Sequence, residues 1–105
     1  MSTPDGRTVD DIVNRAHDQI ALLEDTLAGL DGIRVRVDSE GGEVTAEVDG
    51  NGALTGLWMD DAITRLDARA VEALVVSTAA EAARQATERR TKIMAALENG
   101  FERRA

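Results

Sequence analysis

The hydrophobic pattern in the N-terminal part of the chain is that of one amphipathic helix. Thr8 is a suitable N-cap, and Asp10 and Asp11 follow it where the helix dipole favours negative charge. Gly29 and Gly32 predict the end of this helix, because glycine readily adopts the left-handed conformation that stops helices. Between these limits apolar residues recur every three or four positions, which places them on one stripe: Val9, Ile12, Val13, Ala16, Ile20, Leu23, Leu27 and Leu30.

The pattern then alternates between apolar and polar residues from about residue 33 to 59, which predicts a three-stranded antiparallel meander. Residues 39–42 form the first turn, and Gly50-Asn51 suits a two-residue turn between the second and third strands. The first turn predicts that Val37 faces Val44. One sheet face then collects the apolar side chains, and the other collects Arg34, Arg36, Thr45, Glu47, Leu54, Gly56 and Trp58.

A second and longer helix is predicted from Ala68, with Asp67 as its N-cap, after a short helical turn that follows Asp60-Asp61. Its apolar stripe is interrupted by the polar segment 87–92 and then resumes. Gly100 marks its predicted end, so the helix would be about 48 Å long at 1.5 Å per residue. Such a helix should extend beyond the small sheet and either project into solvent or pack on another subunit.

The composition indicates a small single domain with a thin core. The chain has 105 residues, no cysteine, and Trp58 and Phe101 as its aromatic residues. A small core makes association with a second copy a natural source of stability. The lack of cysteine fits a reducing cytoplasm, and neither a membrane-spanning segment nor a signal peptide is predicted.

The charge is distributed unevenly along the chain. Residues 1–67 carry 5 basic and 15 acidic residues, a balance of -10, whereas residues 68–105 carry 7 basic and 5 acidic residues, a balance of +2, and the sum is -8. An anion-binding surface is therefore expected in the C-terminal third. Two interpretations of its basic cluster remain open, an ordinary solvated helix face with charge pairs or a patch that contacts phosphates. The cluster comprises Arg84, Arg89, Arg90, Lys92, Arg103 and Arg104.

No motif predicts catalysis, a cofactor or a metal. Residues 50–52 lack the third glycine of a dinucleotide-binding loop and lie between strands, so a turn is the better interpretation. His17 has no second histidine or cysteine with which to share a metal. Asp10-Asp11 and Asp60-Asp61 are explained by the electrostatics of helix starts. We therefore predict that the protein is not an enzyme.

The polar face of the predicted sheet carries two unexpected apolar residues. Arg34 is predicted to lie opposite Glu47 as a cross-strand pair. Leu54 and Trp58 on the same face indicate that a helix of the chain, a second copy or another protein covers it. The predicted dimer or partner interface comprises Leu54, Trp58, Val44 and Leu57.

Several segments in this order resemble the YbaB/EbfC family of nucleoid-associated proteins. They are Ser39-Glu40-Gly41-Gly42-Glu43-Val44-Thr45-Ala46-Glu47-Val48-Asp49-Gly50, then Gly52-Ala53-Leu54, then Leu57-Trp58-Met59-Asp60, then an alanine-rich helix from Ala68. The resemblance covers about residues 9 to 100. It implies an α+β fold of the order α-β-β-β-α, with one domain at residues 8–100 between a flexible segment 1–7 and a tail 101–105.

The same resemblance implies a bacterial, cytoplasmic homodimer shaped like tweezers, which binds DNA in the nucleoid and has no enzymatic activity, cofactor or membrane attachment. The sheets would form its body, and the basic residues of the second helix would contact DNA. The segments Leu57-Trp58-Met59 and 79–83 are similar to actinobacterial relatives, some of which are associated with type VII secretion loci. This implies an alternative function, an adaptor or stabiliser of partner proteins that does not bind DNA.

Overall fold

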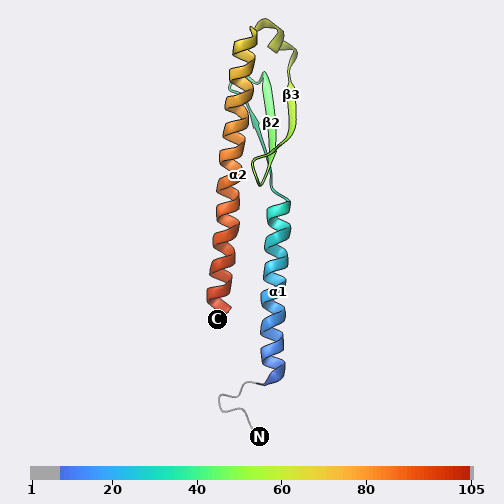
Figure 1. The fold of residues 1–105 in the computed structure, drawn as a ribbon, viewed down its shortest axis with the longest axis vertical. Helices are drawn as coiled ribbons and strands as arrows, with labels where there is room; N and C mark the ends of the chain where they lie inside the picture. Colours follow the sequence, from blue (N-terminus) through green and yellow to red (C-terminus); the bar gives the residue numbers. More distant parts are fainter. Residues whose placement is uncertain (1–7, 105) are drawn as a thin grey trace.

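The structure, a computed structural model, describes residues 8–104. The segment 1–7, which was predicted to be flexible, and Ala105 lie outside the described residues. The order of elements is the predicted one and gives an α+β fold (Figure 1). The elements are α1 (Val9–Asp31), β1 (Arg34–Asp38), β2 (Val44–Asp49), β3 (Leu54–Met59), the short 3-10 helix η1 (Asp61–Arg65) and α2 (Ala68–Arg104).

The predicted helix starts are confirmed by hydrogen bonds. The Thr8 hydroxyl accepts a hydrogen bond from the Asp11 amide, and the Asp11 carboxylate accepts one from the Thr8 amide, which completes a capping box. The Asp67 carboxylate accepts a bond of 2.8 Å from the Ala70 amide at the start of α2. Gly32 caps the end of α1 with a φ of -81°, so the predicted left-handed conformation there is wrong.

The predicted end of α2 at Gly100 is also wrong, because the helix continues to Arg104. Gly100 lies against α1, where an added Cβ would come within 2.8 Å of Leu22 Cδ2. The missing side chain therefore permits a close contact between the helices instead of ending one of them. Most of the predicted tail at 101–105 is consequently helical.

The meander is confirmed, with the strand order β1-β2-β3 and antiparallel pairing throughout. The predicted register between β1 and β2 is wrong by two residues, since Val37 pairs with Ala46 and not with Val44. The reason is a longer loop, which is closed by a bond of 2.7 Å from the Ser39 amide to the Val44 carbonyl. A shift of two residues leaves every β1 side chain on its predicted face.

The second hairpin differs from the prediction at its turn. The Gly52 amide donates to the Asp49 carbonyl at 3.0 Å, and Gly52 has a φ of +81°. The loop therefore spans residues 50–52 instead of the predicted pair Gly50-Asn51. A tight turn followed by a left-handed glycine is a common three-residue hairpin connection.

A β-bulge then reverses the predicted faces of two residues in β3. Glu47 pairs with Gly56 whereas Val48 pairs with Leu54, so Thr55 is an extra residue in the strand. The Thr55 hydroxyl donates to the Glu47 carboxylate at 2.8 Å, which places Thr55 on the polar face. Leu54, opposite Val48, lies on the apolar face, and the prediction that it lies beside Trp58 is wrong. The physical reason is that one extra residue shifts a pattern whose period is two.

The core lies between α2 and the first two strands. The α2 helix packs on β1 and β2, and β3 lies largely outside this contact. Alanine at two positions of α2 lets the helix approach the sheet closely. The buried apolar residues are at most 4% exposed and comprise Ile33, Val35, Val44, Ala46, Val48, Ala82 and Ala86.

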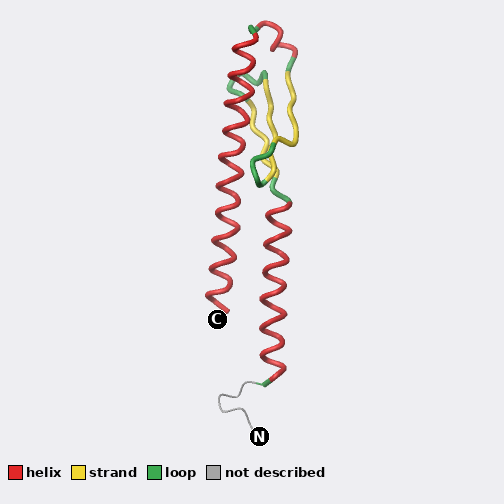
Figure 2. The backbone as a smooth tube through the Cα atoms, viewed as in Figure 1, coloured by secondary structure: helices red, strands yellow, loops and turns green. Residues whose placement is uncertain are grey.

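The molecule is a long rod of 81 × 16 × 15 Å. Its radius of gyration is 22.0 Å, whereas a compact domain of this length has about 13 Å. Below the sheet, α1 and the C-terminal half of α2 run antiparallel as a helical arm (Figure 2). Among residues 8–104, no helix has the length and hydropathy needed to cross a membrane.

Candidate nucleic-acid interface

All six residues of the predicted basic cluster belong to α2, but they have different environments. Arg84 is held between Glu81 and Glu88, one turn away on either side, through a guanidinium–carboxylate bond of 2.6 Å to Glu81. Its positive charge is therefore balanced by its own helix. Arg84 corresponds to the interpretation of the cluster as an ordinary helix face with charge pairs.

The ion pairs of Arg84 with Glu81 and Glu88, called the Arg84 clamp below, should affect the stability of the protein in acid. Hydrogen bonds from Arg84, and then from Gln85, lower the pKa of Glu81 from 4.5 to about 2. Because this pKa is lowered by folding, the clamp contributes stability above pH 4.5, and this contribution is lost as the pH falls towards 2. We expect the melting temperature of Glu81→Gln to fall less over this interval than that of the native chain. Circular dichroism melts should show no such difference for Glu72→Gln, an exposed carboxylate of the same helix.

Arg89 and Arg90 connect α2 to the sheet. The Arg89 guanidinium donates to the Arg34 carbonyl in β1, and the Arg90 guanidinium donates to Asn51 Oδ1 in the β2–β3 turn, each at 2.9 Å. These are bonds between segments far apart in sequence. Both arginines therefore stabilise the fold, and their removal would change more than the surface charge.

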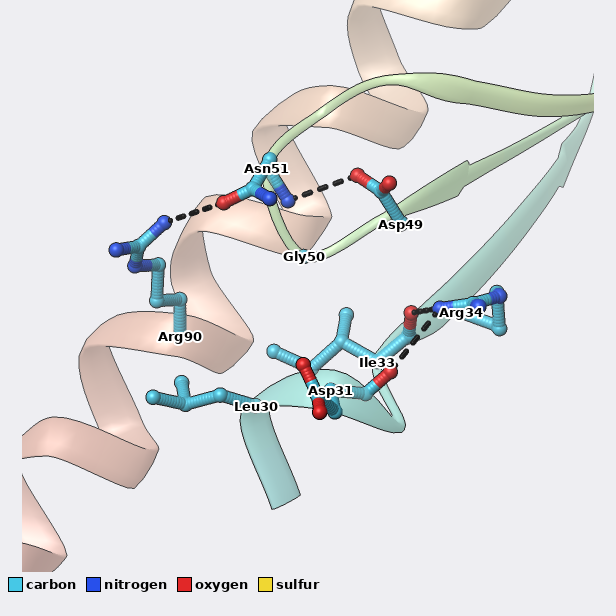
Figure 3. Close-up of a pocket in the computed structure, with 8 residues that line it drawn as sticks. All are labelled: Leu30, Asp31, Ile33, Arg34, Asp49, Gly50, Asn51 and Arg90. Atoms are coloured by element: carbon cyan, nitrogen blue, oxygen red, sulfur yellow. Dashed lines mark hydrogen bonds between the residues drawn. The ribbon is translucent and has the colours of Figure 1, made fainter. Parts of the chain in front are cut away.

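A cavity of about 220 Å³ lies at this junction of α1, the β2–β3 turn and α2 (Figure 3). Arg90 lies on one side of it, while Arg34 donates to the carbonyls of Asp31 and Ile33 at the end of α1. Asp49, a further lining residue, accepts from the amides of the adjacent turn. Since the arginines bond to protein oxygens and carboxylates balance their charge, the cavity is a structural junction and a poor anion site.

Lys92 and Arg103 are the cluster residues best placed to contact phosphates. Both side chains are exposed on the part of α2 that lies in the arm. Within the described part of the chain, neither has a hydrogen-bond or ion-pair partner. Arg104 ends the helix, and its side chain lies outside the described part.

The polar face of the sheet carries a small network around Trp58. The guanidinium of Arg36 lies 4.2 Å from the centre of the indole and also pairs with Glu47 at 3.0 Å. Hydrogen bonds from Thr55, and then from Arg36, lower the pKa of Glu47. The predicted pairing of Glu47 with Arg34 is wrong, because the two-residue change of register places Arg36 there.

The four predicted interface residues do not form one patch. Val44 is fully buried inside the single chain and offers no surface. Leu57 is half-buried and pairs with Ala46 on the apolar face of the sheet, where Leu54 also lies. Trp58 faces the opposite side and is 46% exposed. Met59 follows Leu57 on the apolar face, as the alternation predicts, and it is exposed, although it was not among the predicted interface residues.

The fold is a slender α+β one that carries exposed cations on its long terminal helix. Among residues 8–104, no group of His, Cys, Asp or Glu is suited to a metal. The chain belongs to the YbaB/EbfC DNA-binding family, whose model matches residues 6–101. This family is not enzymatic, and its description is that of a DNA-binding family. The predicted membership of this family is confirmed, and so is the prediction that the protein is not an enzyme.

The fold is also similar to a solved structure, the crystal structure of the uncharacterized protein HP0035 from Helicobacter pylori. The match has a TM-score of 0.61 and 17% sequence identity, and it covers 84% of this chain and 94% of that chain. At this identity the likeness shows the fold. No curated protein matches the chain.

Proposed function

We propose that the protein binds duplex DNA as a homodimer in the bacterial nucleoid, with little base specificity, through phosphate contacts from Lys92 and Arg103. The observation that carries this proposal is the presence of exposed, unpaired cations on the arm of a chain from a DNA-binding family. Arg89, Arg90 and Arg104 would add positive potential nearby, whereas Arg84 is neutralised by its own helix.

The apolar surface of β3 supports the homodimer. α2 does not cover this strand, and Leu54 and Met59 remain 51% and 50% exposed on the face that packs inward elsewhere in the sheet. A second copy would bury this surface and would bring two sets of arm cations into one particle. The elongated shape is also consistent with this assembly.

The proposed binding should be weak and dependent on salt. Each chain has a net charge of -8, so the cations act against an overall repulsion from DNA. We expect the logarithm of the binding constant to fall linearly with the logarithm of salt concentration, with a slope that corresponds to about two to four phosphate contacts. Fluorescence anisotropy with labelled duplexes of different sequence measures both the slope and the base specificity.

Variants of the arm test which cations are responsible. Lys92→Ala with Arg103→Ala should abolish most of the salt-dependent binding, because it removes the two unpaired cations of the cluster and leaves the contacts of Arg89 and Arg90 with the sheet intact. Arg84→Ala is the matched control and should leave the slope unchanged, since its clamp already neutralises that charge. If duplexes fail to bind even at low salt, or if the double variant binds as well as the native chain, the proposal is wrong.

A second function is favoured by Trp58, whose indole is exposed and stacked with Arg36. In this alternative the protein is an adaptor or stabiliser of partner proteins. Leu57-Trp58-Met59 resembles actinobacterial relatives, some of which are associated with type VII secretion loci. Trp58 is the single tryptophan, so its fluorescence reports directly on this face. An emission change with a candidate protein and none with DNA would favour the adaptor, because the proposed DNA contacts lie on the arm and Trp58 lies on the sheet.

A further inference from the structure

The exposed side of α1 carries an uninterrupted apolar stripe, of which only the last residue, Leu30, packs against the core of the described chain. Its positions alternate strictly by four and three residues, which is the spacing of a coiled-coil seam. The first and the last positions of its exposed part, Val9 and Leu27, are 75% and 61% exposed. The seam comprises Val9, Val13, Ala16, Ile20, Leu23, Leu27 and Leu30, of which all but Leu30 are exposed.

A different face of α1 contacts α2. Leu22 lies against Gly100, and Gly29 lies against Ile93, with Thr26 buried between them. At 3.6 residues per turn, this line is roughly a third of a turn away from the seam. The contact with α2 therefore leaves the seam open from Val9 to Leu27, while Leu30 packs against the core.

The first part of the seam has no α2 beside it. The two contacts between the helices are antiparallel and in register, since seven residues separate Leu22 from Gly29 and seven separate Ile93 from Gly100. Continued in the same register, the end of α2 at Arg104 lies level with Asp18. The residues of α1 before Asp18 extend past the end of α2, which Figure 1 also shows. This projection makes one end of the seam accessible to another molecule.

Acidic residues line the seam on the side away from α2. Asp10, Glu24 and Asp31 each directly follow a seam residue and lie on its side away from α2. Over its whole length α1 has six acidic residues and one arginine, a balance of -5. Flanking charges of this kind determine which helices pair in coiled coils. The α1 helix of a second copy would carry the same negative charge and is therefore disfavoured as the occupant.

We propose that the α1 seam is a docking site for a basic amphipathic helix of another protein. The apolar face of that helix would cover the seam, and its lysines and arginines would pair with the acidic flank. This site is separate from the cations of α2, so it goes beyond the proposed DNA binding and does not depend on it.

The test uses synthetic fluorescent peptides, because a designed helix presents the chemistry directly. The first peptide has three heptads with isoleucine and leucine at the seam and lysine at both flanks. The second has glutamate at the flanks, and the third has the composition of the first with its apolar residues scattered around the helix. Anisotropy titration should show that the native chain binds the first peptide about tenfold or more tightly than the other two.

Two variants locate the site on α1. Ile20→Gln with Leu27→Gln replaces two apolar seam residues by glutamine, which is a good helix former. This variant should bind the lysine peptide about tenfold more weakly. Asp10→Lys with Glu24→Lys should reverse the preference towards the glutamate peptide. Circular dichroism checks that α1 stays helical, and Lys92→Ala with Arg103→Ala should leave peptide binding unchanged.

Three results would overturn this proposal. Equal affinity for the first and the third peptide would mean simple attraction to a negatively charged protein. Unchanged binding by the seam variant would place the peptide elsewhere. A smaller sedimenting particle for Ile20→Gln with Leu27→Gln than for the native chain would identify a second copy as the occupant.

Discussion

Replacement of Ala82 by aspartate should prevent the protein from folding. Ala82 is fully buried where α2 meets the sheet, beside Val35 and Val48. An aspartate there would place an unpaired carboxylate in the core, at a cost of about 4 kcal/mol or more. Domains of this size are stable by only about 5–15 kcal/mol, and a small core leaves this chain near the lower end. The expected result is the loss of cooperative unfolding in urea.

The matched control for this prediction is Ala95→Asp. Ala95 lies on the same helix but is exposed, so the same change costs only the difference in helix propensity, about 0.6 kcal/mol. Circular dichroism and urea titration at equal concentrations compare the two variants. If both variants unfold at the same midpoint as the native chain, the contact between α2 and the sheet is not the core of the protein.

Aspartate at both Leu54 and Met59 should convert the proposed dimer into folded monomers. Both side chains are about half-exposed in the single chain, so the change leaves the core of one protomer intact. In the dimer, the partner would have to bury two charges on each copy, a cost that exceeds what a small interface supplies. Sedimentation equilibrium should give half the particle mass, with an unchanged helical circular dichroism signal.

Trp58→Ala distinguishes the two faces of the sheet in the same experiment. The indole lies on the polar face, whereas Leu54 and Met59 lie on the apolar face beyond the reach of α2. We expect Trp58→Ala to remain dimeric. If Trp58→Ala is monomeric and the chain with Leu54→Asp and Met59→Asp is dimeric, the dimer interface lies on the polar face instead.

Local patterns in the sequence predicted the elements and their caps. Thr8 and Asp67 are N-caps because a side-chain oxygen beside free helix amides needs no distant partner. The alternation of apolar residues likewise predicted the meander and the buried face of β1 and β2. These features depend on neighbours within a few residues, and the sequence displays such neighbours directly.

The candidate site was only partly visible in the sequence. Six basic residues looked alike, but Arg84 is clamped by its own helix, while Arg89 and Arg90 bond to the sheet and its turn. The clamp could have been read from the spacing of Glu81 and Glu88. The bonds of Arg89 and Arg90 could not, because they join segments 55 and 39 residues apart.

The sequence by itself determined that the protein consists of two helices around a meander. It also showed that the first helix is amphipathic and that the positive charge lies in the C-terminal third of the chain. Only the tertiary structure decided which parts of these surfaces remain open. There α2 continues past Gly100, which packs closely against Leu22, and a bulge places Leu54 on the apolar face. The structure also showed that the stripe of α1 is exposed, since α2 packs on a neighbouring face. Periodicity identifies an apolar face, but what covers that face depends on contacts between distant segments.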